Sequence, residues 1–260
     1  MIKIIKYSFF DLIRSRWAIF YGIFFLLFTS VLLAFSPDLS KVIISLMNVV
    51  LVLCPLIATM FGAMYYYNTG EFRELLLAQP IRRRSIFWGQ SIGLSLSLTL
   101  SLLAGIGIPF VAYGVFASAQ IWNFLILIGI GIVLSVIFSA IAYLIALMNA
   151  NHIRGFGIAI LSWLFFALIY DGIFLMLLSV FREYPLESAA LAGSLFNPID
   201  MARILILLKL DVSALMGYTG AVFQRFFGNI TGILIALSAL ALWLVIPGML
   251  IQRISARRDF

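Results

Sequence analysis

Charged residues are scarce in this chain of 260 residues: Asp, Glu, Lys and Arg make up only 10%, whereas hydrophobic residues make up 64%. Soluble domains carry about 25% charged and ~45–50% apolar residues. The mean hydropathy of +1.17 agrees with this imbalance. The composition excludes a water-soluble fold and predicts a chain embedded in a lipid bilayer.

Cysteine and histidine are rarer still, with one of each, Cys54 and His152. A disulfide within the chain and a multi-residue Cys/His metal site are therefore excluded. Cys54 could be imagined as a copper ligand beside Met47, Met60 or Met64. Methionines in apolar helices usually pack, however, and no ligand set accompanies the thiol at helical spacing. We expect neither a bound metal nor a cofactor in this chain.

Motifs for catalysis are also missing from the sequence. There is no GxxxxGK[ST] loop to hold nucleotide phosphates, no HExxH and no GxSxG elbow. The single histidine lies in the short loop Met148 to Arg154, which leaves no credible Ser/His/Asp set. We predict that the chain is not an enzyme and that any energy source belongs to another chain.

What the chain has in abundance is long apolar runs. About 20 apolar residues cross a ~30 Å hydrocarbon core as a helix. Six segments are long enough: 17–35, 42–65, 86–111, 122–147, 156–181 and 230–250. We predict an all-α polytopic membrane protein in which residues 1–260 form a single transmembrane domain.

The cations give a topology for these six spans. An even number of spans puts both termini on one side of the bilayer. Twelve of the 17 cations fall on that side: Lys3, Lys6, Arg14, Arg16, Arg73, Arg82, Arg83, Arg84, Arg154, Arg253, Arg257 and Arg258. The other five are Lys41, Arg182, Arg203, Lys209 and Arg225. The positive-inside rule places both termini in the cytoplasm, so the net charge of +7 reflects topology rather than nucleic acid binding.

The first sixteen residues have a helical pattern of their own. One face carries Ile2, Ile5, Phe9, Leu12 and Ile13, and the other carries Lys3, Tyr7, Asp11, Arg14 and Ser15. This pattern predicts an amphipathic elbow helix in the interface. The alternatives are an extension of the first span or the start of a signal peptide, although the run 17–35 lacks an obvious cleavage site.

Two polar segments interrupt the spans. The cytoplasmic segment 68–85 predicts a short helix that stops before Pro80 and is followed by a basic anchor, Arg82 to Arg84. The outer segment 182–229 contains a helix start, with Asn197 as N-cap, Pro198 at the first position and Asp200 near the positive end of the dipole. The apolar stretch 201–210 is too short to span, and we expect it to lie in the outer interface or to be re-entrant.

Asp171 is an ionisable residue well inside a predicted span. A charge at that depth costs ~2.5–3.5 kcal/mol on insertion scales, so the side chain should face the bundle interior or a polar cavity. Two interpretations stay open: a polar site on a translocation path, or a structural residue held by hydrogen bonds.

The stretch from Gly70-Glu71 through Leu75-Leu76 to Pro80-Ile81 resembles the segment of ABC-2 permeases in which a coupling helix docks into an ATPase. The resemblance implies an amphipathic helix before span one and short re-entrant helices between spans five and six, matching 1–16 and 197–223. It also implies a coupling site, formed by Gly70, Glu71, Phe72, Arg73, Glu74, Leu75 and Leu76. Glu71, Arg73 and Glu74 would then face the ATPase while Leu75 and Leu76 pack into its groove. The alternative is a solvated amphipathic loop.

A narrower resemblance rests on the runs Asn197 to Arg203 and Leu210 to Phe223, which are similar to NosY-type permeases. It implies two permease copies in the bacterial inner membrane, two NosF-type ATPases that bind ATP and Mg, and a periplasmic NosD-type β-helix protein. The outer contact residues would be Asn197, Pro198, Asp200, Arg203, Gly217, Tyr218 and Gly220. The complex would handle copper or sulfur for nitrous oxide reductase maturation. Alternatives are an ABC-2 exporter of a drug, lipid or glycan, and a non-transporting scaffold that transmits force.

Overall fold

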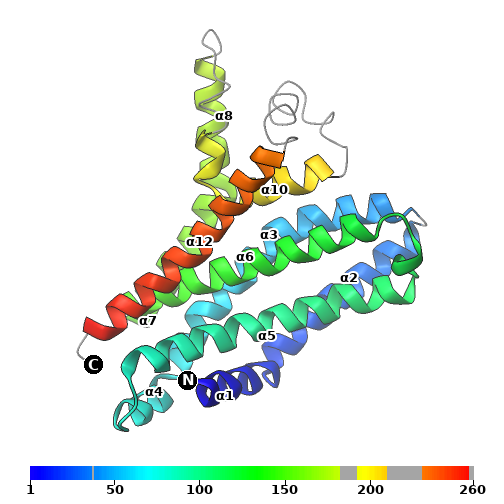
Figure 1. Cartoon of the computed structure of the whole chain (residues 1–260). Coiled ribbons are helices and arrows are strands. Elements are labelled where there is room, and N and C mark those ends of the chain that lie inside the picture. The colour runs from blue at the N-terminus through cyan, green and yellow to red at the C-terminus, as the bar shows by residue number, and fades with distance from the viewer. Residues whose placement is uncertain (37, 182–191, 210–229, 258–260) are drawn as a thin grey trace.

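The computed structural model describes residues 1–36, 38–181, 192–209 and 230–257. Within these ranges every long element is a helix and no strand is present (Figure 1). Six helices are long and apolar enough to cross a membrane. They are α2 (Arg16–Phe35), α3 (Leu39–Asn68), α5 (Arg83–Ala112), α6 (Ile121–Met148), the continuous helix His152–Leu177, and Gly232–Ala256 within α12 (Ile230–Arg257). The chain is therefore an all-α, multi-pass membrane protein, as the sequence predicts.

The observed helices extend beyond several of the apolar segments. α3 and α5 each have 30 residues because they continue through polar residues to a cap or turn. At the start of α3, the Asp38 carboxylate accepts a hydrogen bond from the backbone N–H of Ser40 at 3.0 Å. At the start of α2, the Ser15 hydroxyl accepts one from the N–H of Ala18 at 3.3 Å. The length of an apolar run therefore indicates the membrane-spanning part, whereas the caps and turns determine where the helix begins and ends.

Shorter helices complete the described fold. α1 (Ile2–Ile13) packs on α5, and α4 (Gly70–Leu77) follows α3 directly. η1 (Val115–Ala117) joins α5 to α6, and α10 (Pro198–Lys209) packs against α12, α6 and α3. Figure 1 shows α1, α4 and the last turns of α12 at one end of the bundle, which we call the α4 end.

Small residues bring the inner spans close together. An added Cβ at Gly62 of α3 would lie 2.7 Å from the carbonyl oxygen of Ser139 in α6. One at Gly105 of α5 would lie 2.7 Å from the carbonyl oxygen of Gly22 in α2. Packing of small residues is the usual means of helix association where lipid removes the hydrophobic driving force. The core thus consists of α3 and α6 packed together, with α5 joining them to α1 and α2.

The fifth span differs from the others in its shape and in how little of it is buried by neighbouring helices. It consists of α7 (His152–Leu164), a π-helical segment η2 (Phe165–Ile169) and α8 (Tyr170–Val180). Only 6% of its most apolar window is buried, against 61% for α6. Figure 1 shows α8 projecting away from the bundle. π-Helical segments are rare and often occur at functional sites, so the residues around η2 are candidates for a functional site.

Candidate functional site

A polar network joins the fifth span to α10. The Arg203 guanidinium lies 2.9 Å from a carboxylate oxygen of Asp171 and 3.2 Å from one of Asp200. The Asn197 amide donates to Asp200 at 3.0 Å and to Asp171 at 3.3 Å. The sequence predicted an individual role for each of these four residues, and the structure brings all of them together.

Asn197 also fixes the backbone on both sides of the network. Its side-chain oxygen accepts a hydrogen bond from the N–H of Ile199 at 3.0 Å, which confirms it as the N-cap, followed by Pro198 as the first helical residue. Its amide donates to the Phe166 carbonyl, within η2, at 2.9 Å. Because a π-helical segment changes the backbone hydrogen-bond pattern of its span, a side-chain donor at this carbonyl stabilises the break.

α10 begins deep beside the spans. Phe166 lies near the middle of the fifth span, and Trp243, whose indole N–H donates to the Leu195 carbonyl at 3.3 Å, lies near the middle of α12. Tyr170 adds a third tie, since its hydroxyl donates to the Gly193 carbonyl at 2.6 Å. This depth is what a re-entrant helix would show, and the position of α10 relative to a bilayer stays a prediction.

The network is only partly screened from its surroundings. The side chains of Asp171, Asp200 and Arg203 are 23%, 12% and 33% exposed. Burial raises the pKa of the Asp200 carboxyl to about 7, and the neighbouring charge of Asp171 acts in the same direction, whereas Arg203 opposes both. Because two carboxylates share one guanidinium, Asp200 retains a proton near neutral pH.

We expect the stability of the chain to depend on pH through Asp200. Between the ordinary aspartate pKa and pH 7, the folded chain keeps a proton that the unfolded chain has released, so stability falls as pH rises across this range. Asp200→Asn should remove this contribution. Thermal unfolding in detergent from about pH 5 to about pH 8 would show the melting temperature of the variant rising relative to that of the parent.

Among the residues that the structure describes, the charged and titratable groups that face Asp200 are Asp171, Arg203 and Tyr170. Asp171→Asn is therefore the matched control, since it keeps Asp200 titratable while removing the neighbouring negative charge. It should retain a pH slope that Asp200→Asn lacks. Parallel melting curves for the parent and Asp200→Asn at every pH would contradict the assignment.

The second candidate is the exposed face of α4. Glu71, Glu74 and Leu75 are exposed, with Leu75 at 67%, and their spacing puts them on one side of the helix. α4 runs from Gly70 to Leu77, and a single residue, Thr69, separates it from the end of α3. The predicted short helix in segment 68–85 is therefore present, with a carboxylate-rich stripe facing outward.

Two residues of the predicted coupling site are turned inward, which corrects the expectation for them. Arg73 is only 8% exposed: its guanidinium donates to the Tyr66 carbonyl at 2.8 Å and lies 3.8 Å from the centre of the Tyr66 ring. Leu76 is 9% exposed and belongs to the core. Arg73 finds a carbonyl and an aromatic face there, so its charge is satisfied inside the protein. Arg73 and Leu76 therefore anchor α4 rather than face a partner.

Phe72 holds α4 against α1. Its ring stacks on Tyr7, with centroids 4.4 Å apart and planes at 23°. Sequence reasoning assigned Tyr7 only to a polar face of the first helix, and no sequence signal linked it to Phe72.

Metal ligands are not gathered in the part of the chain that the structure describes, where no group of three or more His, Cys, Asp or Glu could hold an ion. Cys54 is buried, and its sulfur accepts a hydrogen bond from the Tyr21 hydroxyl at 3.4 Å. Gly217, Tyr218 and Gly220, predicted as outer contact residues, lie outside the described residues.

Two known proteins are similar to this chain, while no family model matches it. One, from Pseudomonas aeruginosa, is described as a probable ABC transporter permease protein NosY and is 26% identical over 223 residues, covering 80% of this chain and 81% of that protein. A protein of the same description from Stutzerimonas stutzeri is 28% identical over 185 residues, covering 68% of this chain. The match spans 63% of the Stutzerimonas protein, which is less than two thirds of its length.

Proposed function

We propose that this chain, a NosY-like ABC transporter permease subunit, receives the force of ATP hydrolysis at α4 and transmits it to α10. The transporter would thereby handle copper or sulfur for the maturation of periplasmic nitrous oxide reductase. The observation that carries the proposal is the α4 helix, whose outer face exposes Glu71, Glu74 and Leu75 while Arg73 fastens it to the core.

The first step of the proposed transmission runs from α4 into the spans. The Thr69 hydroxyl, between α3 and α4, donates to the Tyr65 carbonyl at 2.8 Å, and Arg73 bonds the next carbonyl, that of Tyr66. A displacement of α4 would therefore pull on the end of α3. Because α3 packs along α6 with small residues at the contact, the two helices would move as a unit.

The second step runs into the fifth span. The Tyr67 hydroxyl, near the end of α3, donates to the Asn149 carbonyl at 3.1 Å, and its ring lies 4.5 Å from that of His152 at the start of α7. An added Cβ at Gly155 would overlap the Tyr67 hydroxyl, so only glycine permits this approach. α7 then leads through η2 to the network around Asp171, Asn197 and Arg203.

The proposed assembly contains two copies of this chain and two copies of an ATPase that bind ATP and Mg, in a bacterial inner membrane with both termini cytoplasmic. A periplasmic NosD-type β-helix protein would dock beside α10. The burial of Cys54 against Tyr21 supports transmission rather than copper storage by this chain.

A non-transporting scaffold is the second candidate function, and the network favours it. Asp171 is paired with Arg203, so this intramembrane carboxylate is already neutralised by the protein. In that case the chain would pass force to a periplasmic partner without moving a solute. Recovery of an ATPase but no β-helix protein would instead point to a general ABC-2 exporter.

The experiment that tests the proposal is charge reversal on the exposed face of α4. Glu71→Lys with Glu74→Lys should reduce recovery of the ATPase by at least about tenfold, because two attractive contacts become repulsive at the contact face. Co-purification of a C-terminally tagged permease with the neighbouring ATPase, followed by an ATP hydrolysis assay, measures the loss. The double variant should still elute as a folded membrane protein.

The matched control adds positive charge at the other end of the bundle, with Ala117→Lys and Ala119→Lys on the exposed segment between α5 and α6. Recovery of the ATPase should be normal with this control. Normal recovery with Glu71→Lys and Glu74→Lys as well would reject α4 as the docking helix.

A further inference from the structure

Pro55 lies inside α3, and its ring is buried in the bundle. Because proline has no N–H, the Leu51 carbonyl loses its usual helical donor, and the ring crowds that carbonyl as well. One turn later the Thr59 hydroxyl donates to the Pro55 carbonyl at 2.7 Å, a type of bond that often bends helices. α3 is thus easiest to bend around Pro55.

α6 has a matching feature at the same level of the bundle. The Ser135 hydroxyl donates to the Gly131 carbonyl at 2.8 Å, which is the same kind of bond that Thr59 makes in α3. An added Cβ at Gly131 would lie 3.1 Å from the Val50 side chain, so this part of α6 faces α3 close to Pro55. The two helices can therefore bend together and keep their close contact.

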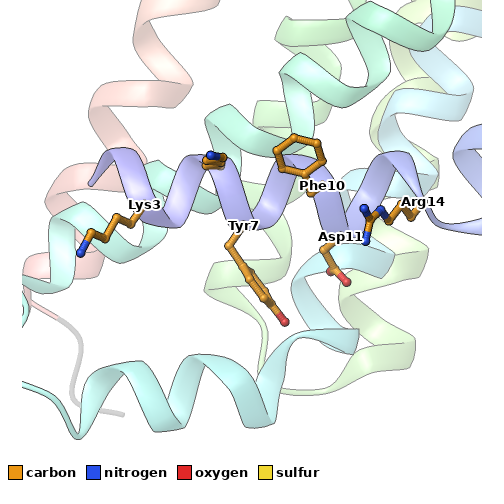
Figure 2. Close-up of a pocket in the computed structure, with 6 residues that line it drawn as sticks. Lys3, Tyr7, Phe10, Asp11 and Arg14 are labelled. Atoms are coloured by element: carbon orange, nitrogen blue, oxygen red, sulfur yellow. The ribbon is translucent and has the colours of Figure 1, made fainter.

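A displacement of α4 would reach α3 on one side of Pro55 only. The Arg73 guanidinium is bonded to the Tyr66 carbonyl in the last turns of α3. Figure 2 shows Tyr7 extending from α1 towards α4, where its ring stacks on Phe72. These contacts join α1, α4 and the last turns of α3 at the α4 end, and Pro55 separates them from the rest of α3.

The fifth span is attached to α3 on both sides of Pro55. Near the α4 end, the Tyr67 hydroxyl donates to the Asn149 carbonyl just before α7. On the other side of Pro55, the indole N–H of Trp163, in the last turn of α7, donates to the Val52 carbonyl at 3.2 Å. A membrane interior supplies no water to replace such a bond. A bend in α3 between these two contacts would therefore displace α7.

The next element after α7 can take up this displacement. α7 is a regular α-helix, whereas η2 begins two residues after Trp163 and has the irregular hydrogen bonding of a π-helix. Such segments are common places for a helix to kink. The Phe166 carbonyl within η2 accepts a hydrogen bond from Asn197 at the start of α10. A change in η2 would consequently be felt by α10.

We propose that α3 bends at Pro55 when α4 is displaced, and that Trp163 passes this bend to η2 and so to α10. The inference rests on the proposed function, because it assumes that a partner moves α4. It makes Pro55 the hinge of the transmission and Trp163 the positioning residue that links the two irregular helices.

The test is Trp163→Phe, which keeps an aromatic ring but removes the N–H that bonds Val52. The reporter is a spin label on Leu168→Cys, since Leu168 lies in η2 and is 60% exposed, whereas the native Cys54 is buried. In the complex with the co-purified ATPase, a non-hydrolysable ATP analogue should change the spectrum of the label. Trp163→Phe should reduce this change about twofold or more, while recovery of the ATPase and ATP hydrolysis stay normal.

Two matched controls accompany the test. Trp88→Phe also removes an indole hydrogen bond, which Trp88 donates to the Gly248 carbonyl of α12 at 3.0 Å, and it should leave the response of the label unchanged. Pro55→Ala supplies the missing N–H and stiffens α3, so it should reduce the response as Trp163→Phe does. Pro109→Ala makes the same change within α5 and should not.

The outcomes separate the inference from the proposed function. A full response in Trp163→Phe or in Pro55→Ala overturns the inference and leaves the transmission from α4 intact. An equal loss in Trp163→Phe and Trp88→Phe also overturns it, since any lost indole bond would then have the same effect. If the parent binds the ATPase but its label does not respond to the nucleotide, the proposed transmission itself fails. Trp163→Tyr, which also lacks the indole N–H, repeats the test if Trp163→Phe does not fold.

Discussion

Replacing Arg203 with methionine should lower the free energy of unfolding by about 2–3 kcal/mol, because two carboxylates then lose the cation they share. Breaking a fully buried pair costs about 3–5 kcal/mol, and the partial exposure of this network reduces that figure. Thermal and denaturant unfolding of the purified chain in detergent, near pH 8, measures the effect.

A rescue experiment distinguishes lost charge pairing from lost packing. Asp171→Asn with Asp200→Asn in the Arg203→Met background removes the uncompensated charges and should restore most of the stability. Lys41→Met, at an exposed cation outside the network, should have little effect. If Arg203→Met unfolds like the parent, the ion pairs do not hold α10 against the fifth span.

The same variant bears on transmission. Arg203→Met leaves α4 and α1 untouched, so recovery of the ATPase should be normal. If the network passes force to α10, ATP hydrolysis should continue while any response from the periplasmic partner declines. A chain of contacts alone does not establish such coupling. Recovery of the ATPase and the response of the periplasmic partner therefore have to be measured separately.

The six spans could be predicted from the sequence because apolarity over about 20 residues is enough to specify a transmembrane helix. The start of α10 could also be predicted, since Asn197, Pro198 and Asp200 are a local capping signal that Ile199 completes in the structure. Both signals are local: neither depends on which other helix lies nearby.

The network itself could not be predicted, because the Arg203–Asp171 ion pair joins residues 32 positions apart in the sequence. Asp171 and Arg203 are each costly in an apolar environment, and that shared cost is a signal that they belong together. The π-helical segment beside them had no sequence signal, since Phe165 to Ile169 is apolar like the rest of the span.

The sequence pattern of each short helix also could not predict which of its faces is buried. The resemblance to a coupling helix placed Arg73 on the outward face, but the Tyr66 ring and carbonyl accept its guanidinium inside the protein. On α1, Ile2 is 81% exposed whereas Ser8 is buried, because Gly89 and Gly93 of α5 set the rotation of the helix. Helical period gives the faces of a helix, and the neighbouring helix selects which face turns inward.

Gly62→Leu should cost about 3 kcal/mol or more of unfolding free energy, because its side chain would meet backbone rather than a movable side chain. At Gly62 an added Cβ lies 2.7 Å from the Ser139 carbonyl oxygen and 2.8 Å from the Ala142 Cβ, so α3 and α6 would have to separate. That movement would also disturb the Ser95–Ser139 hydrogen bond, which is 3.0 Å long and joins α5 to α6.

Gly129→Leu is the matched control, since an added Cβ at this position of α6 meets nothing within 4 Å. Leucine there should be tolerated or stabilising, since it has the higher helix propensity and is well accommodated in lipid. Comparing the two variants by unfolding in the same detergent isolates the close approach of α3 and α6 from the general effect of replacing glycine. Equal stability of Gly62→Leu and Gly129→Leu would mean that α3 and α6 are not closely packed, and the route from α4 through α3 would lose its physical basis.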